Sequence, residues 1–417
     1  MTSTATPEHR VPAVDGGRPV LSRLVRVDGE EFADRIWSRE PLLSRADELG
    51  GAAGFDDLFS ADAVDELVAG RGLRTPFLRM AKDGTTLPDR SFTRGGGIGA
   101  AIADQASDDA VLRHFAEGST LVLQGLHRTW GPVLEFSQRL AAELGHPVQV
   151  NAYITPPQST GFADHYDVHD VFVLQIAGEK RWRIRRPVHE LPLRDEPWTD
   201  HRAAVEAAAR EAPVIEETFR PGDCLYLPRG WLHSATALGG TSIHLTIGVH
   251  SWTRRHVADR LVETAVRAAS RGPGLRGSLP VGVDLVRDGA GADDVEQVRA
   301  ALVEAIQAVD ATDLAAALAA QARAAQRPAP LAPLAQAEAA RALTDDTELA
   351  LRDHVAARLE PVAGGRTVIR SRTGVVPVEH ADLASVGALL DTGRARAGDL
   401  GIELARTLLT SGVVVPA

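Results

Sequence analysis

The sequence predicts an α+β protein in which a β-rich middle segment lies between two mainly helical regions. Helical spacing of apolar residues prevails over residues 28–150 and returns after about residue 252. From about residue 147, short runs rich in Val, Ile, Thr, Tyr and Trp are separated by Gly, Pro and Asp, which is typical of strands and turns. Several short strands in succession favour a barrel or a sandwich.

Composition narrows the class of protein. The 417 residues are enough for two or three domains. The formal net charge of -11 disfavours nucleic acid and membranes as partners. Cys224 is the single cysteine, which excludes an intramolecular disulfide and fits a reducing compartment. The N-terminus has no apolar core like that of a signal peptide, and no run approaches the ~20 apolar residues of a membrane span. We therefore expect a cytoplasmic protein with no membrane association.

Three helices are predicted before the β-rich segment. Residues 32–43 begin as a helix that Pro41 stops. Residues 60–70 combine a Ser cap, apolar residues at helical spacing and a terminal Gly. Residues 130–145 form a third helix of the same type.

The predicted strands lie in VQVNAYITP (148–156), DVFVLQIAG (170–178), KRWRIRRP (180–187), ETFRPGDCLYLP (217–228) and SIHLTIGVH (242–250). In the third of these, Trp182 and Ile184 alternate with arginines. Successive side chains of a strand point to opposite faces, so this alternation indicates a strand with one buried face.

Beyond the strands, helices are predicted at 252–272, 293–310 and 313–326. Three prolines in residues 327–335 indicate a linker, although a kinked connection within one helical layer is the alternative. The apolar faces of the amphipathic helices over 255–326 need cover from the same chain or from a twin, so we predict a homodimer.

Residues 336–417 read as helix, hairpin, two short helices and strand, with the hairpin turn at Arg372–Gly374. That order is compatible with a winged-helix module. The segment holds 9 Lys and Arg residues against 11 Asp and Glu residues, whereas a helix that reads a DNA groove normally carries more positive charge. A protein-interaction or packing module is therefore favoured over DNA binding.

Candidate metal ligands lie in the β-rich segment. His165-Tyr166-Asp167 is a His-x-Asp pair, and on a strand residues two apart point to the same side. His233 follows a Gly-Asp turn and the turn Pro-Arg-Gly-Trp. Two histidines and one carboxylate leave three metal positions open, as in non-haem Fe(II) oxygenases. This ligand set suits Fe(II) or Mn(II), and zinc remains possible, although structural zinc prefers four ligands.

Lys180 lies at the start of the strand KRWRI, fifteen residues after His165. If it faces the barrel interior, the buried ammonium needs an anionic partner, which a diacid cosubstrate could supply. A solvated lysine at the strand end is the alternative.

Four motifs resemble the JmjC-type ribosomal oxygenases: NAYITPP, HYDVHDVFVLQIAGEKRWRI, PGDCLYLPRGWLH and SIHLTIG. These are Fe(II)- and 2-oxoglutarate-dependent protein hydroxylases with a cupin-like double-stranded β-helix. The resemblance extends more weakly upstream through FADRIWSREPLL and DDLFSADAVDELV. The family's order of modules implies a JmjC catalytic domain at 1–252, a helical dimerisation domain at 253–330 and a winged-helix-like domain at 336–417.

The resemblance also implies roles for individual residues. His165, Asp167 and His233 would bind Fe(II), and Lys180 would pair with the distal carboxylate of 2-oxoglutarate, with O2 as the other cosubstrate. The further implied contacts are Asn151 and Thr246 to the cosubstrate, and Tyr153 to the substrate; the alternative for each is an ordinary strand residue.

The segment after Asp167 departs from the family, which often reads HYDDxE where this chain has Val168, His169 and Asp170. On a regular strand His169 would point to the side of the ligands and contact the substrate. The alternative is a strand histidine that is hydrogen-bonded locally.

The reaction implied is hydroxylation of a protein side chain, with histidine or arginine of a ribosomal protein as the leading substrate. Three alternatives stay open: the same chemistry on a peptide natural product or small molecule, demethylation of N-methyl-lysine, and a non-catalytic cupin-like binding protein or regulator. The net acidic chain favours encounter with a basic substrate.

Overall fold

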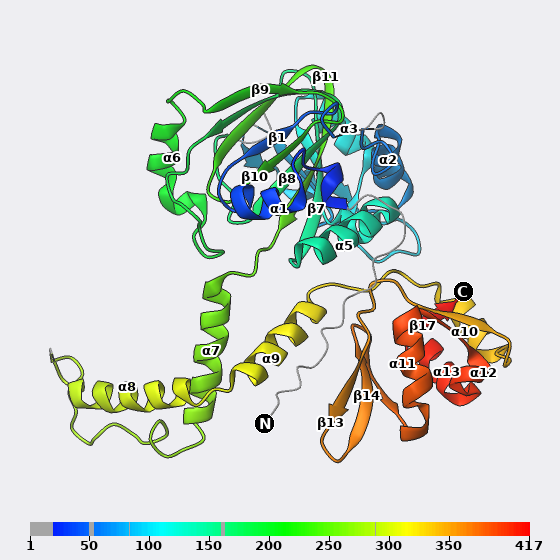
Figure 1. Ribbon diagram of the computed structural model, residues 1–417. Helices are drawn as coiled ribbons and strands as arrows, with labels where there is room; N and C mark the ends of the chain where they lie inside the picture. Colours follow the sequence, from blue (N-terminus) through cyan, green and yellow to red (C-terminus); the bar gives the residue numbers. More distant parts are fainter. Residues whose placement is uncertain (1–19, 50–53, 83, 160–162, 288) are drawn as a thin grey trace. The chain divides into compact units, whose positions relative to one another are not determined.

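The computed structural model describes residues 20–49, 54–82, 84–159, 163–287 and 289–417. Contacts within the chain divide it into an N-terminal unit, Met1–Ser251, and a C-terminal unit, Trp252–Ala417 (Figure 1). Among the described helices, none has both the length and the apolar character that crossing a membrane requires.

The N-terminal unit is built on one antiparallel sheet with the strand order β1-β10-β8-β11-β7-β6-β2-β3, and β9 pairs with β8. The strands of this sheet are β1 (Leu42–Ser44), β2 (Leu78–Lys82), β3 (Thr85–Thr86), β6 (Thr120–Leu123), β7 (Val148–Thr155), β8 (Asp170–Arg185), β9 (Ile215–Phe219), β10 (Cys224–Leu227) and β11 (Leu232–Val249). Strands β4 (Thr93–Arg94) and β5 (Gln105–Ala106) pair in a separate small sheet. The helices and helical turns of the N-terminal unit are η1 (Val20–Arg23), α1 (Gly29–Glu31), η2 (Phe32–Ile36), α2 (Ala61–Asp65), η3 (Glu66–Gly70), η4 (Asp89–Ser91), α3 (Asp108–Ala116), α4 (Leu126–Thr129), α5 (Gly131–Leu144), η5 (Trp198–His201) and α6 (Arg202–Ala208).

Strands β8 and β11, of 16 and 18 residues, pair with each other along nearly their whole length. The first half of β8 also pairs with β10, and its second half pairs with β9. The sequence predicted two strands here. They form one continuous strand that passes through Gly178. This residue has φ 65°, and a Cβ here would lie 2.2 Å from the carbonyl oxygen of Thr241, so glycine is required at this position.

The alternation of side chains along β7 separates two environments. Val150, Ala152 and Ile154 are buried in a core that includes residues of α5, which lies beside β7 (Figure 1). Asn151, Tyr153 and Thr155 belong to the opposite face of the strand. A second apolar cluster lies among β8, β9, β10 and β11, and its buried members are Val171, Val173, Trp182, Ile184, Phe219, Leu225, Leu227 and Ala235. The β-rich middle segment thus has an interior of its own, as a barrel requires.

Two of the three helices predicted upstream are confirmed. The prediction at 60–70 corresponds to α2 and η3, where the Ser60 hydroxyl accepts the N–H of Ala63 at 3.2 Å, and the prediction at 130–145 corresponds to α5. The prediction at 32–43 is confirmed at its helical start, but it is wrong that the helix continues until Pro41 stops it. The helix ends at Ile36, and residues 42–44 form β1 because they pair with β10.

The C-terminal unit contains the predicted helices and the predicted hairpin, whose turn joins Ser371 to Gly374. Its elements are α7 (Arg254–Ala269), α8 (Ala292–Gln307), α9 (Ala311–Ala324), α10 (Pro333–Arg341), β12 (Glu348–Leu351), β13 (Arg358–Val362), β14 (Arg366–Ser371), β15 (Gly374–Val378), η6 (His380–Asp382), α11 (Leu383–Thr392), β16 (Arg394–Arg396), α12 (Ala397–Leu400), α13 (Ile402–Thr410) and β17 (Val414–Pro416). The strands form two small sheets, β16-β12-β17 and β13-β14-β15. The sequence did not predict β12, β13 or β16.

Candidate metal centre

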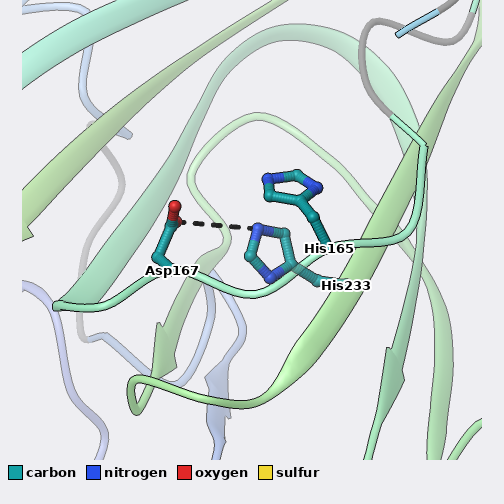
Figure 2. Close-up of side chains that lie close together, drawn as sticks. All are labelled: His165, Asp167 and His233. Carbon is teal, nitrogen blue, oxygen red and sulfur yellow. Dashed lines mark ion pairs between the residues drawn. The ribbon is translucent and has the colours of Figure 1, made fainter. Parts of the chain in front are cut away.

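Three side chains from distant parts of the sequence meet at one end of β11. His165 and Asp167 precede β8, and His233 is the second residue of β11. One ligand atom from each lies within 4.8 Å of the others, and within the described ranges no other group of His, Cys, Asp and Glu does so. The Nε2 of His233 is 3.8 Å from the Oδ2 of Asp167, and Figure 2 shows the three side chains converging.

The backbone places these ligands differently from the prediction. The sequence put the His-x-Asp pair at the start of a strand, but β8 begins at Asp170. An isolated bridge joins His165 to His233: the N–H of His165 donates to the carbonyl of His233 at 3.2 Å, and the N–H of His233 donates back at 2.8 Å. The pleat of a regular strand therefore does not bring the pair together. This bridge, together with the bend after it, does.

Hydrogen bonds to main-chain carbonyls orient both imidazoles. The Nδ1 of His165 lies 2.7 Å from the carbonyl oxygen of Ala163, and the Nδ1 of His233 lies 3.1 Å from that of Trp231. A carbonyl only accepts, so each Nδ1 carries the proton and each ring would ligate a metal through Nε2. Metal-ligating histidines commonly donate their other N–H to a carbonyl in this way.

The electrostatics of the cluster favour the protonation states that bind a cation. Burial, together with His165, lowers the pKa of His233 to about 4. Burial acts to raise the pKa of Asp167, but the neighbouring His169, His233, His165 and Arg79 outweigh it, and the pKa of this carboxyl is lowered. At neutral pH the cluster thus presents a neutral imidazole at His233 and an ionised carboxylate.

Lys180 is buried inside the N-terminal unit, which excludes the solvated alternative. Its side chain is 4% exposed, and its Nζ donates to the Thr155 hydroxyl at 3.1 Å. Among the residues that the structure describes, no carboxylate pairs with it. Burial lowers its pKa to about 7. A buried amine without a counter-charge is the feature that an anionic ligand would complete.

Aromatic side chains lie between Lys180 and the candidate metal ligands. The Nζ of Lys180 lies 5.8 Å from the centre of the Trp182 ring, and that ring lies 6.2 Å from the ring of His233 and 5.4 Å from that of His244. The Nε1 of Trp182 and the Nδ1 of His244 are buried and have no hydrogen-bond partner among the described residues. Such atoms cost free energy unless a ligand satisfies them.

Neither Trp182 nor His244 was predicted from the sequence as a residue of this site. A signal for Trp182 was present, because it lies two residues after Lys180 and shares its strand face. His244 lies opposite Tyr153 in the β7–β11 pair, and their rings stack at 5.0 Å.

The other predicted contacts lie on the same sheet. Asn151 and Thr246 are paired across β7 and β11, and the Asn151 side chain accepts the N–H of Gly125 at 3.1 Å. Burial raises the pKa of Tyr153, whose hydroxyl forms a hydrogen bond with Arg79 of β2. Arg79 comes from far upstream, and no motif in the sequence marked it.

His169 lies just before β8, in the bend after the ligand pair. Its ring stacks on that of His250 at 5.3 Å and 3°. The ring also packs against Gly248, where a Cβ would lie 2.4 Å from the Cδ2 of His169. His169 is therefore held by its neighbours and not by a regular strand.

Comparisons with known proteins agree with this architecture. Residues 133–257 match the JmjC domain family. The chain is 30% identical over 285 residues to ribosomal oxygenase 1 of Gallus gallus, and 27% identical over 245 residues to the bifunctional lysine-specific demethylase and histidyl-hydroxylase NO66 of Drosophila persimilis. These alignments cover 66% and 58% of this chain, and 44% and 33% of those relatives. The chain thus spans less than half the length of either.

A solved structure extends the likeness to nearly the whole chain. The ribosomal oxygenase YcfD of Escherichia coli matches with a TM-score of 0.51 at 17% identity, over 94% of this chain and 99% of that one. The same protein in complex with cobalt and succinic acid gives a TM-score of 0.52 at 16% identity, with the same coverage. At this identity the likeness concerns the fold alone. The predicted JmjC fold is supported by the family match over residues 133–257.

Proposed function

From the JmjC domain that this chain carries, we propose an Fe(II)- and 2-oxoglutarate-dependent oxygenase that hydroxylates a protein side chain, with histidine or arginine of a ribosomal protein as its substrate. The observation that carries this proposal is the convergence of His165, Asp167 and His233, with both Nδ1 atoms held by carbonyls. The relatives named ribosomal oxygenase and histidyl-hydroxylase support the reaction and the substrate class.

The donor set fits ferrous iron. Two neutral nitrogens and one carboxylate oxygen match the ligand preference of Fe(II), and they leave coordination positions for the cosubstrate and dioxygen. A structural zinc site would close its shell with a fourth ligand, for which the described residues offer none within 4.8 Å.

The residues beyond the ligands fit a dicarboxylate. Lys180 supplies a buried cation, and the Nε1 of Trp182 and the Nδ1 of His244 supply polar atoms that nothing else in the described residues satisfies. Lys180 is proposed to bind the distal carboxylate of 2-oxoglutarate. Asn151 and Thr246 are proposed as further contacts, as the family resemblance implies.

Iron and 2-oxoglutarate, when bound with O2, would supply the oxidant that inserts oxygen into an unactivated C–H bond. The chain's own residues would position the metal and the cosubstrate and would exclude water. His165, Asp167 and His233 would hold the metal, and Lys180 would orient the cosubstrate through its charge. The apolar interior around Trp182 and Ile184 would keep bulk water away from the reacting atoms.

The substrate would approach past Tyr153 and His169, the two residues proposed to contact it. Asp167, next to both, has a lowered pKa and adds negative charge to this region. The net charge of -11 also favours encounter with a basic ribosomal protein. A ribosomal substrate would place the enzyme in the cytoplasm.

We further propose that residues 253–330 form a helical dimerisation domain and residues 336–417 a winged-helix-like domain, in a homodimer. The exposed apolar residues of α7 and α8, Val257, Val262, Val266, Val295, Val298 and Val303, support a partner for these helices. Light scattering at micromolar concentration tests this proposal: the mass of a dimer would support it, and a monomer would contradict it.

The activity test supplies Fe(II), 2-oxoglutarate and O2 with candidate ribosomal proteins, and measures succinate together with the intact mass of each protein. We expect succinate and one added oxygen atom on a single protein. Loss of a methyl group with release of formaldehyde would identify a demethylase instead. Succinate with no mass change on any protein would favour a small-molecule or peptide substrate, and no turnover with any metal would refute the oxygenase.

A further inference from the structure

Asp170, the first residue of β8, is a fully buried carboxylate at the centre of a hydrogen-bond cluster. Its Oδ1 accepts the main-chain N–H of Arg229 at 2.8 Å and lies 3.8 Å from the Nη1 of that arginine. Its Oδ2 accepts three hydroxyls: those of Ser38 at 2.9 Å, Tyr226 at 3.2 Å and Ser251 at 3.4 Å. A buried carboxylate is stable only when hydrogen-bond donors surround it, and the fold places such donors on both oxygens of Asp170.

The donors come from four segments. Ser38 follows η2, Tyr226 belongs to β10, Arg229 lies in the turn between β10 and β11, and Ser251 follows β11. Asp170 itself lies three residues after the ligand Asp167. One carboxylate therefore joins the segment that carries two metal ligands to the turn that precedes the third.

That turn is the link to His233. The N–H of Gly230 donates to the carbonyl of Asp167 at 3.0 Å, and the carbonyl of Trp231 holds the Nδ1 of His233 at 3.1 Å. Asp170 fixes the same turn through the N–H of Arg229. A shift of the turn would thus move both the main chain at Asp167 and the ring of His233.

Ser38 shows how firmly the cluster is held. It has φ 55°, a left-handed conformation that is uncommon outside glycine. Its N–H donates to the Tyr226 hydroxyl at 2.8 Å while its own hydroxyl donates to Asp170. Such a conformation persists only where the surroundings impose it.

We infer that Asp170 is a positioning residue that sets the geometry of the metal centre without contacting the metal. The inference rests on the proposed metal-dependent function. It assigns to Asp170 the role of holding the turn at Arg229–Trp231 in register with Asp167, so that His233 reaches the same ion as His165.

The test uses the full chain, with Co(II) alone as the probe, in Asp170→Asn and in a matched control, Asp223→Asn. Asp223 is also buried and also accepts main-chain N–H groups, from Ala46 and Arg220, together with the guanidinium of Arg45, but none of these hydrogen bonds involves the turn at Arg229–Trp231. Calorimetry gives the Co(II) affinity, visible absorption gives the coordination of the bound ion, and thermal melting gives the stability of each variant.

Both variants should melt at lower temperature than the wild type. Only Asp170→Asn should weaken Co(II) binding, by about 10- to 100-fold as is typical of residues behind a ligand, and change the Co(II) spectrum. Ser38→Ala, which removes one donor and stays folded more readily, should weaken binding by a smaller factor. Folded Asp170→Asn with wild-type affinity and spectrum would overturn the inference, as would equal weakening in Asp223→Asn. A wild-type chain that binds no Co(II) would instead refute the metal centre itself.

Discussion

His165 and His233 exchange main-chain hydrogen bonds, at 3.2 Å and 2.8 Å, although 68 residues separate them in the sequence. Their ring centres lie 4.4 Å apart as a consequence. The candidate metal centre therefore depends on a contact between two backbones and not only on the three side chains that would hold the ion. Substitutions of the ligands should remove metal binding and leave this backbone contact in place.

Asp167→Ala and His233→Ala should each abolish turnover of 2-oxoglutarate, with a loss of at least about 100-fold, because even residues behind a ligand cost up to that factor. Both proteins should stay folded, since neither side chain belongs to an apolar core. Succinate formation and circular dichroism check the two statements. His380→Ala, in an exposed position of the C-terminal unit, is the control and should keep full activity.

Lys180→Met should separate stability from cosubstrate binding. The folded pKa of about 7 lies below the ordinary value of 10.5, so burial of the charge destabilises the wild type fully below pH 7, and this penalty disappears as the pH rises to 10.5. The variant without cosubstrate should therefore melt higher than the wild type at pH 6, and this gain should shrink above pH 7.

The same variant should bind 2-oxoglutarate at least about tenfold more weakly, because a charge-assisted hydrogen bond is lost. Melting curves at pH 6 and pH 9, with and without 2-oxoglutarate, measure both effects. Glu179→Gln, an exposed neighbour on β8, should change neither. A lower melting temperature of Lys180→Met at pH 6 would contradict a net destabilisation by the buried charge.

Gly248→Ala should destabilise the chain by about 1–3 kcal/mol, the usual cost of overpacking. Its Cβ would lie 2.4 Å from the ring of His169, which must then leave its stack on His250. In the double variant with His169→Ala the clash partner is gone, and the second substitution should restore most of the lost stability. Urea unfolding of the four proteins of this cycle measures the coupling. Strictly additive effects would rule out the contact as the cause.

Cys224 should be inert in the native protein. It is fully buried in β10, and burial, with Asp223 nearby, raises the pKa of its thiol. Ellman's reagent should therefore detect no thiol under native conditions and the single thiol after unfolding in urea. Rapid labelling of the folded chain would contradict the burial of this strand.

The sequence was most informative where chemistry and periodicity coincide. His165, Asp167 and His233 could be proposed as metal ligands from their residue types and their order in the sequence. The alternation at Trp182 and Ile184 correctly indicated a buried strand face. Their meeting could not be derived from the pleat, because it depends on the bridge between His165 and His233, which is a non-local contact.

Non-local contacts, which the sequence does not reveal, also explain the other differences between the predicted and the observed structure. Leu42 and Leu43 follow the predicted helix stop at Pro41 and were assigned to no strand, and the partner strand β10 draws them into the sheet. Arg79 contacts Tyr153, and Asp170 accepts the hydroxyl of Tyr226. Both partners are far away in the sequence, and nothing in the neighbouring sequence indicates these contacts. Gly178 looked like a strand end, although it is a turn that only glycine can make within one continuous strand.

The two-sided pattern of β7 has a consequence for how such a protein can change. Val150, Ala152 and Ile154 pack into the apolar core on one side, while Asn151, Tyr153 and Thr155 lie on the other face, where Thr155 contacts Lys180 and Tyr153 stacks on His244. Selection for a new substrate, in nature or in a directed-evolution library, can therefore sample the odd-numbered positions while the even-numbered ones stay fixed. One strand thus carries both the positions that can vary with the substrate and the positions that keep the fold stable while they vary.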